Sequence, residues 1–306
     1  MDFNSRRHEF IGGSDVAALM GLSRWNTPLG VWAEKTKQVE QKDLSEVEAI
    51  EWGVKLEGVV ADKFAEVTGK KVLVDETEYT HPEYPYMCAH IDRMTSDGEV
   101  LEVKTASAYK VKEWEADEIP EEYQLQLNWY LGIVGKEVGW LAVLIGGQKF
   151  LHKKMDFSHA LFDKQVEMAK DFWEGYVLKG IPPLAVGGDK DTLTELFPDS
   201  IGEMQVLRGE NPEIEEMFNQ LVIDYTEGRD QVKSLERDVE ETANKLRQII
   251  KDTEGVETGQ YIATWKAQKS RKLDIVRLKK DGLYESYATE KTIRVLRAHE
   301  KKASKA

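Results

Sequence analysis

Cysteine is almost absent from this chain of 306 residues, because Cys88 is its only one. A single cysteine can form no disulfide within the chain, and it excludes a four-cysteine iron–sulfur cluster and a structural zinc ribbon. Long apolar runs are also missing, since none approaches the roughly 18 to 20 residues of a membrane span. The mean hydropathy is −0.51. We therefore expect a soluble protein with no membrane contact, in a reducing compartment such as the cytoplasm.

Basic residues are outnumbered, with 42 Lys and Arg against 56 Asp and Glu and a formal net charge of −14. This balance is not that of a protein that wraps nucleic acid over its whole surface. The charge is uneven, however, because residues 266–306 hold 13 basic and 5 acidic side chains. This basic tail can supply phosphate contacts, or it can be an ordinary solvated terminus.

The strongest chemical signal lies in residues 92–104, Asp-Arg-Met-Thr-Ser-Asp-Gly-Glu-Val-Leu-Glu-Val-Lys. An apolar run ends at Asp92, a Ser-Asp-Gly turn signal follows, and the next six residues alternate with period two as a second strand. Glu102 and Lys104 share one face because they are two residues apart, and the register can bring Asp92 beside them. Two carboxylates and an ammonium suit a hard divalent cation and a neighbouring water. A solvated hairpin edge would have the same composition.

The N-terminal segment contains Gly-Gly-Ser-Asp before an apolar run, which predicts a helix capped by Ser14 and ended by Gly21. A capped helix is one interpretation. The other is an anion site at the helix N-terminus, which Arg7 would complete for a phosphate.

The order of the expected elements predicts an α/β core with a mixed sheet and helices on both of its faces. Two polar side chains on these helices have ordinary alternatives: Glu57 can simply face water, and Gln126, on the face of Tyr123 and Tyr130, can be a satisfied core residue. The expected elements are helices at about 47–69, 119–134 and 158–179, strands at about 71–79, 86–94 and 99–105, and a hairpin at 138–155.

Several motifs that are weak alone occur in one order, and as a set they resemble the YqaJ-type viral recombinase family over about residues 5–180. These are phage-type relatives of lambda exonuclease in the PD-(D/E)XK nuclease superfamily, named for an Asp…Glu-x-Lys core. The motifs here are Arg7 with Gly12-Gly13-Ser14-Asp15, Trp52-Gly53 with Glu57, Asp92, Glu102-Val103-Lys104, Ile119-Pro120 with Tyr123 and Gln126, and residues 141–147.

The resemblance implies a restriction-endonuclease-like core and a nuclease that depends on Mg²⁺, with Mn²⁺ able to substitute. Such an enzyme degrades duplex DNA from a free end, 5′ to 3′, and a phage-type annealing protein uses the exposed single strand in recombination. Lambda exonuclease is a ring-shaped trimer, so a homotrimer is the expectation by analogy.

The resemblance also implies roles for single residues. Asp92, Glu102 and the Val103 carbonyl become metal ligands, and Glu57 becomes a further ligand of the metal or its water. Lys104 holds and activates the attacking water, either as a positioning charge or as a base.

The remaining carried-over roles concern positioning and substrate. Gln126 helps to position the site, and Arg7 and Ser14 form a pocket for a 5′-phosphate. Two residues depart from the family pattern: Asn128 replaces a second Gln, and Arg93 replaces the Gly of lambda-type members. Arg93 can contact DNA or merely fill space.

We assign the nuclease domain to residues 1–183 and a C-terminal part of unknown role to residues 184–306. From Ile214 to Ile249 apolar residues recur at alternating steps of four and three, interrupted at Gly228 and Thr242. This predicts one long helix or a pair broken near Gly228, which either lies on its own domain or forms a coiled-coil-like arm. A small hairpin with basic flanks is expected after it.

Two other functions share these residues. An endonuclease or branched-DNA resolvase would need the same carboxylates, and an inert nuclease fold could serve as a DNA-binding or recombinase-recruiting module. The intact Asp92, Glu102 and Lys104 argue against the inert module.

Overall fold

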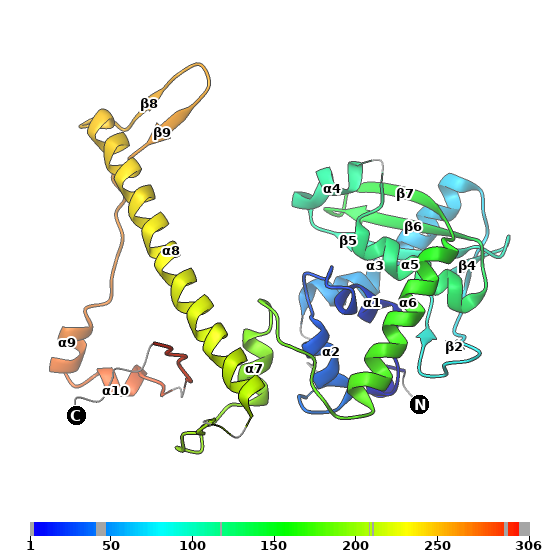
Figure 1. Cartoon of the computed structure of the whole chain (residues 1–306). Helices are drawn as coiled ribbons and strands as arrows, with labels where there is room; N and C mark the ends of the chain where they lie inside the picture. The colour runs from blue at the N-terminus through cyan, green and yellow to red at the C-terminus, as the bar shows by residue number, and fades with distance from the viewer. Residues whose placement is uncertain are drawn as a thin grey trace. The chain divides into compact units, whose positions relative to one another are not determined.

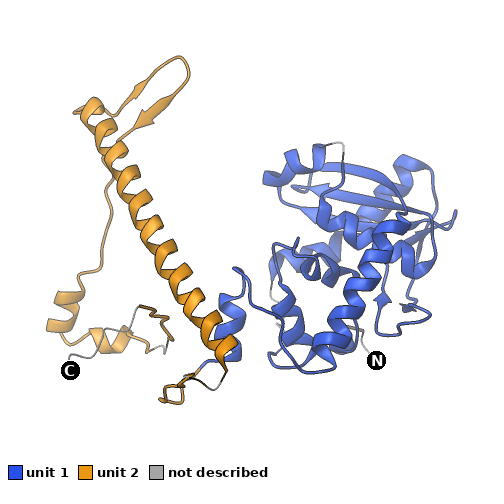
Figure 2. Ribbon diagram, in the orientation of Figure 1, with its two compact units in different colours: residues 1–198 blue, residues 199–306 orange. Residues whose placement is uncertain are grey.

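A computed structural model describes residues 3–40, 47–116, 118–207, 209, 211–290 and 293–299, with side chains from residue 6 onward. The chain divides into two compact units, residues 1–198 and residues 199–306 (Figure 2). Each unit is described by itself. The division of function between residues 1–183 and 184–306 stays a prediction.

A five-stranded sheet in the order β1-β4-β5-β6-β7 forms the centre of the first unit (Figure 1). Among the described strands only β5 and β6 pair in parallel, while the other neighbours are antiparallel. This confirms the predicted mixed sheet. Its strands are β1 (Val72–Val74), β4 (Arg93–Thr95), β5 (Val100–Ala106), β6 (Val138–Ile145) and β7 (Lys149–Asp156).

Helices cover both faces of this sheet. On one face α3 (Glu48–Thr68) packs Val60, Ala61 and Phe64 against alternate residues of β5 and β6. On the other face α5 (Glu121–Val134) and α6 (His159–Phe172) enclose the larger core with the N-terminal helices. Because side chains alternate along β5, Leu101 and Val103 face α3, and Glu102 and Lys104 face α5.

Two predicted strands are shorter than expected. The segment predicted as one strand at 86–94 contains β3 (Cys88–Ala89) and β4, with Asp92 between them. The segment predicted at 71–79 contains β1, and β2 (Tyr79–Thr80) pairs with β3 in a separate small sheet. The hairpin of β6 and β7 lies where it was predicted.

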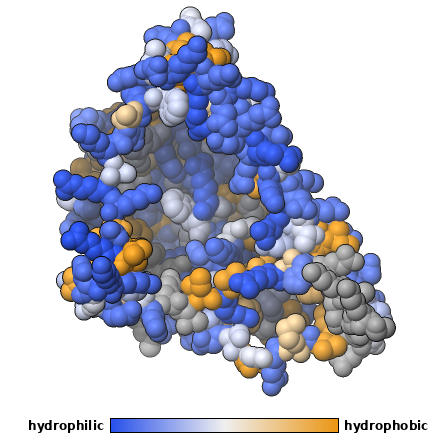
Figure 3. All heavy atoms as spheres, turned by 90° about the vertical axis from the view of Figure 1, so that its left-hand side faces the viewer, coloured by the Kyte–Doolittle hydropathy of each residue, from blue (hydrophilic) through white to orange (hydrophobic). Residues whose placement is uncertain are grey.

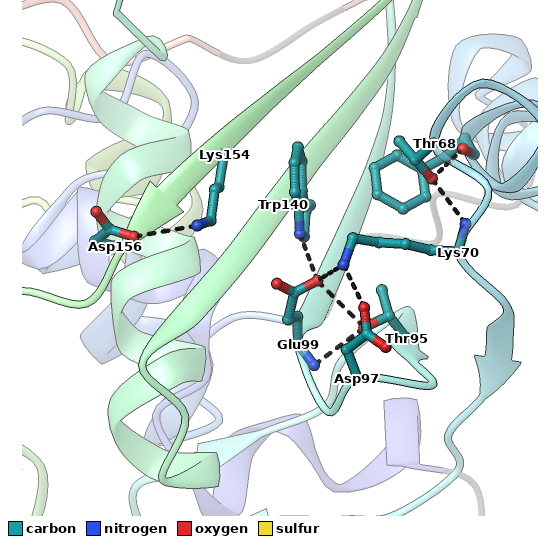
Figure 4. Close-up of polar contacts among 9 residues, drawn as sticks. Thr68, Lys70, Thr95, Asp97, Glu99, Trp140, Lys154 and Asp156 are labelled. Carbon is teal, nitrogen blue, oxygen red and sulfur yellow. Dashed lines mark hydrogen bonds and ion pairs between the residues drawn. The ribbon is translucent and has the colours of Figure 1, made fainter.

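The turn between β4 and β5 is fixed by a polar network (Figure 4). Lys70 forms ion pairs with Asp97 and Glu99, and its Nζ lies 2.8 Å from Glu99 Oε2. The same Oε2 accepts a hydrogen bond of 2.8 Å from Trp140 Nε1 on β6. The network therefore ties the hairpin that carries Asp92 and Glu102 to the neighbouring strands.

The N-terminal segment consists of η1 (Phe3–Glu9), α1 (Gly13–Leu19) and α2 (Pro28–Lys35). The prediction that Ser14 caps α1 is wrong. Gly12 is the N-cap, and its N–H donates to Asp15 Oδ2 at 2.9 Å. Ser14 therefore lies inside the first turn of α1, and its hydroxyl does not serve as the cap.

The second unit is built around α8 (Pro212–Ile250), a helix of 39 residues. It is continuous through Gly228, so the alternative of a broken pair is wrong. A hairpin follows, formed by β8 (Gly255–Glu257) and β9 (Ile262–Thr264). Among the described residues, no helix of either unit combines the length and apolar character needed to cross a membrane.

Candidate active site

The edge of β5 beyond Leu101 is where the candidate residues gather. In the described structure β4 pairs with β5 only at its start, through Arg93 with Leu101 and Met94 with Val100. Asp92 takes up the next position, and its Oδ2 accepts a hydrogen bond of 2.8 Å from the Val103 N–H. Because the N–H and C=O of a strand residue point to the same edge, the Val103 carbonyl also faces the side of Asp92.

Glu102 is the buried centre of this group, with a relative exposure of 1%. Its Oε1 accepts hydrogen bonds from Lys104 Nζ and, at 2.8 Å, from Gln126 Nε2. Its Oε2 is buried and has no hydrogen-bond partner among the residues that the structure describes. The pKa of Glu102 is raised to about 8, first by burial and then by the charge of Asp92, while Lys104 opposes both. A buried acceptor without a partner is costly, so this carboxylate is suited to a ligand that the protein itself does not provide.

Lys104 lies at the boundary between this buried group and solvent, with a side-chain exposure of 24%. Burial lowers the pKa of Lys104 as the largest single influence, but the carboxylates of Glu102 and Asp92 together raise it above its ordinary value. The ammonium is 5.6 Å from the centre of the Tyr123 ring. Tyr123 is itself stacked on Trp114, with ring centres 5.0 Å apart. Lys104 is therefore a charged group held between a carboxylate and an aromatic face.

Gln126 joins this group from α5, and its position was anticipated from its shared helix face with Tyr123 and Tyr130. Its Nε2 donates to Glu102 Oε1 and, at 2.9 Å, to Tyr130 Oη. Burial, with the charges of Glu102 and Asp92, raises the pKa of Tyr130 well above its ordinary value. Gln126 thus links an acidic oxygen of β5 to a neutral phenol of its own helix.

Glu57 does not join the carboxylates of Asp92 and Glu102 in one cluster. Its Oε1 is bound by Nη1 of Arg93, which also donates to the Asp92 carbonyl at 2.6 Å. In the described part of the chain, no three acidic, histidine or cysteine side chains lie together as a ready metal site. Sequence reasoning left Arg93 without a partner, although its position directly after Asp92 placed it beside the site.

Arg7 and Ser14 lie together, since Arg7 Nη2 is 2.8 Å from Ser14 Oγ. A buried ion pair that sequence reasoning missed supports them. Lys35 Nζ donates to Asp15 Oδ2 at 2.7 Å and to the Arg7 carbonyl at 2.8 Å. The side chains of Lys35 and Asp15 are only 1% and 5% exposed. Little in the sequence around Lys35 indicates this buried pair, because a lysine at the end of an amphipathic helix usually faces solvent.

The two groups of residues meet at Tyr130. A Cβ atom at Gly13 would lie 2.4 Å from the Tyr130 ring, so only glycine lets α1 approach α5 this closely. Arg7 is near enough for its charge to lower the pKa of Tyr130, although the other influences outweigh it. The pocket residues and the acidic group are therefore parts of one packed region.

A protein of Bacillus subtilis (strain 168), YqaJ, is 34% identical to this chain over 278 residues, which cover 89% of this chain and 85% of the relative. The chain belongs to the YqaJ family. A model described as the YqaJ-like viral recombinase domain matches residues 2–137. This range contains every residue to which the resemblance assigned a role.

Solved structures of low sequence identity are also similar to this YqaJ family member. An alkaline exonuclease (LHK-Exo) from Laribacter hongkongensis is 14% identical, with a TM-score of 0.48, over 57% of this chain and 91% of that chain. A phage-related exonuclease from Haemophilus somnus 129PT is 10% identical, with a TM-score of 0.38, over 58% of this chain and 100% of that chain.

Proposed function

We propose that the chain is a metal-dependent deoxyribonuclease that degrades linear duplex DNA from a 5′ end. The observation that carries this proposal is the buried Oε2 of Glu102, which no described residue hydrogen-bonds and which belongs to a carboxyl group beside that of Asp92. Two carboxyl groups held this close repel each other when both are ionised, and the raised pKa of Glu102 reflects that cost. A divalent cation bound between them would remove the cost.

The donor set fits a hard cation such as Mg²⁺, with Mn²⁺ able to substitute. Asp92, Glu102 and the Val103 carbonyl offer only oxygen atoms, which this class of ion prefers. When bound, such an ion neutralises charge on a phosphate and lowers the pKa of a water molecule. Glu57 would act as a further ligand only after it releases Arg93, and it is the least supported of the assigned ligands.

Lys104 would hold the water that attacks the phosphorus atom. Its raised pKa keeps the ammonium charged near neutral pH, so we propose that it orients the water and offsets developing charge, instead of acting as the base. Gln126 would keep the Glu102 carboxylate in place through its bond to Oε1.

Arg7 and Ser14 would bind the phosphate of a 5′ end. A guanidinium and a hydroxyl can both donate to phosphate oxygens, and these two already lie 2.8 Å apart. Lys35 would add no direct contact, because its side chain is buried and binds Asp15 and the Arg7 carbonyl. The family description as a viral recombinase supports a role in recombination together with a single-strand annealing protein, and a trimer is the proposal by analogy.

One assay separates this function from its competitors. Purified protein and Mg²⁺ are incubated with linear duplex carrying 5′-phosphate or 5′-hydroxyl ends, and with nicked and covalently closed circles. We expect loss of linear duplex, faster from phosphorylated ends, and intact closed circles. Cleavage of closed circles would establish an endonuclease, and binding without cleavage of any substrate would establish the inert module.

The phosphate pocket has its own test. Arg7→Ala and Ser14→Ala should remove the preference for phosphorylated ends while leaving slow degradation of hydroxyl ends. Thr36→Ala is a suitable control, because its hydroxyl only bonds the carbonyl of Trp32 within its own helix region. Equal loss of rate on both kinds of end would contradict the pocket.

A further inference from the structure

The helix α8 carries a long apolar stripe that the rest of its unit leaves exposed. Eleven positions follow at strict steps of four and three from Ile214 to Ile249, and nine of them are apolar or aromatic. The eight aliphatic and phenylalanine side chains among them are between 43% and 68% exposed. The eight are Ile214, Phe218, Leu221, Val232, Leu235, Val239, Leu246 and Ile249.

The period of this stripe indicates what kind of surface covers it. A helix that packs on a globular surface shows a wider apolar face, whereas a narrow seam with a period of 3.5 residues fits another helix of similar length in a left-handed supercoil. The helix is about 58 Å long at 1.5 Å per residue. The other helices described in this unit, α9 and α10, have six and four residues. Neither can cover a seam of this length.

Charge along α8 favours one relative direction for such a partner. Residues 212–227 contain five acidic and no basic side chains, whereas residues 228–250 contain five of each. A parallel pair of these helices would set the two acidic halves side by side. An antiparallel pair instead places the acidic half of each helix beside the C-terminal half of the other, which contains all of its basic side chains, and this avoids that repulsion.

The two small positions of the stripe favour the same direction. In a parallel pair Gly228 would meet Gly228 and Thr242 would meet Thr242, and both layers would be underfilled. In an antiparallel pair each a position shares a layer with a d position of the second helix. Gly228 and Thr242 both occupy d positions, since the next position of the stripe follows four residues later. The a positions all hold large side chains: Phe218, Tyr225, Val232, Val239 and Leu246. Each small residue is therefore matched with a large one.

We propose that α8 pairs with α8 of a second copy of this chain as an antiparallel two-stranded coiled coil, in which the a positions of each helix pack against the d positions of the other. The pairing joins whatever assembly the nuclease domain forms into an assembly of twice the mass. Hydrophobic side chains in the space-filling view stand among hydrophilic ones (Figure 3), and pairing with a second copy would bury the row of such side chains along α8.

The mass of the full-length protein in solution tests the pairing. Leu235→Glu combined with Val239→Glu places two charges in the seam. The matched control is Ser234→Glu combined with Asn244→Glu, which adds the same charge to the same helix outside the stripe. By light scattering after gel filtration, we expect the seam variant to have half the mass of the wild type and the control to keep the full mass.

Helix content by circular dichroism and cleavage of linear duplex are measured on the same samples. Equal masses of wild type and seam variant, with retained helix content, would overturn the pairing. Should the seam variant lose helix content, disulfide trapping in the full-length chain decides instead, and a wild type with the mass of a single chain would overturn the pairing. Nuclease activity is a separate readout, so loss of the proposed function leaves this test intact.

Disulfide trapping tests the direction in a Cys88→Ala background. Of the two registers in which a and d positions share layers, one pairs Phe218 with Thr242 of the second helix and the other pairs it with Ile249. Phe218→Cys co-expressed with Thr242→Cys or with Ile249→Cys should therefore form a mixed disulfide dimer in one of the two combinations, whereas Phe218→Cys alone should not crosslink with itself. Self-crosslinking of Phe218→Cys without a mixed dimer in either combination would show a parallel pair and overturn the proposal.

Discussion

Two lysine–carboxylate pairs in the first unit differ in how completely their polar atoms are satisfied. In the Lys35–Asp15 pair, one carboxylate oxygen accepts from both Lys35 and the Gly12 N–H, and the lysine also binds the Arg7 carbonyl. In the Lys104–Glu102 pair, one carboxylate oxygen has no partner among the described residues, and the lysine is partly exposed. We call the Lys35–Asp15 pair closed, because its hydrogen bonds are made within the protein and hold α1 and α2 together. We call the Lys104–Glu102 pair open, because one of its carboxylate oxygens can still bind a ligand.

Breaking the closed pair should have the largest effect on stability. Lys35→Met leaves the Asp15 carboxylate buried without its charge partner, and such changes cost about 3–5 kcal/mol of the free energy of unfolding. Urea denaturation measures the loss. Lys63→Met removes an exposed pair with Glu66 and should change stability by less than about 1 kcal/mol. Similar values for the two variants would show that Lys35 is not a structural lock.

Breaking the open pair should affect chemistry more than folding. Lys104→Ala removes the charge proposed to hold the attacking water, and we expect hydrolysis to fall by about 10²–10³-fold, the cost of removing one preorganised donor. DNA binding in the presence of Ca²⁺ should remain. Lys149→Ala, which removes an exposed pair with Glu115, serves as the control. Unchanged cleavage by the Lys104 variant would reject the assigned role.

The contact between α1, which carries Asp15, and Tyr130 of α5, which lies beside the Glu102 group, can be tested at two adjacent glycines. Gly13→Ala drives a methyl group into the Tyr130 ring, whereas the same change at Gly12 meets no atom closer than 3.7 Å. Overpacking of this kind costs about 1–3 kcal/mol, so Gly13→Ala should lower the thermal midpoint clearly more than Gly12→Ala. It should also reduce cleavage if the ring aligns Gln126. Equal thermal midpoints for the two variants would show that α1 can move away from Tyr130 at no cost in stability, and that the contact is not tight.

The last comparison concerns pH, and it uses Glu102→Gln in chelator. The folded-state pKa of Glu102 is about 8 against an ordinary 4.5, so its contribution to stability is full below the unfolded pKa and declines as the pH rises through about 8. Wild-type stability should therefore fall relative to the variant between pH 5 and 8. Urea midpoints at several pH values measure this, and a difference independent of pH would contradict the raised pKa.

Local sequence patterns were enough to predict the open pair but not the closed one. The alternation of β5 placed Glu102 and Lys104 on one face, and the spacing along α5 placed Gln126 beside Tyr130. Lys35 and Asp15 are 20 residues apart on different helices, and no periodicity relates them. Only the packing of α1 against α2 brings their charges together.

The errors of prediction have similar causes. Ser14 was given the cap position because its residue type favours it, but Gly12 and the side chain of Asp15 satisfy the first turn of α1. The apolar run before Asp92 was read as one strand, whereas the chain leaves one small sheet and enters another within it. The continuity of α8 was left open because glycine weakens a helix by about 1 kcal/mol, too little to interrupt so long an element.

The close approach of α1 to Tyr130 has a consequence for the size of the product. Gly13 touches one side of the ring, and the phenol oxygen receives the amide of Gln126. Under the proposed function, the Tyr130 ring then holds the helix that carries Ser14, where a DNA end would be anchored, at a fixed position relative to Gln126, which contacts Glu102 where the backbone would be cut. This fixed placement would set how many nucleotides leave at each step, and a change in that number would require α1 and α5 to be repacked together.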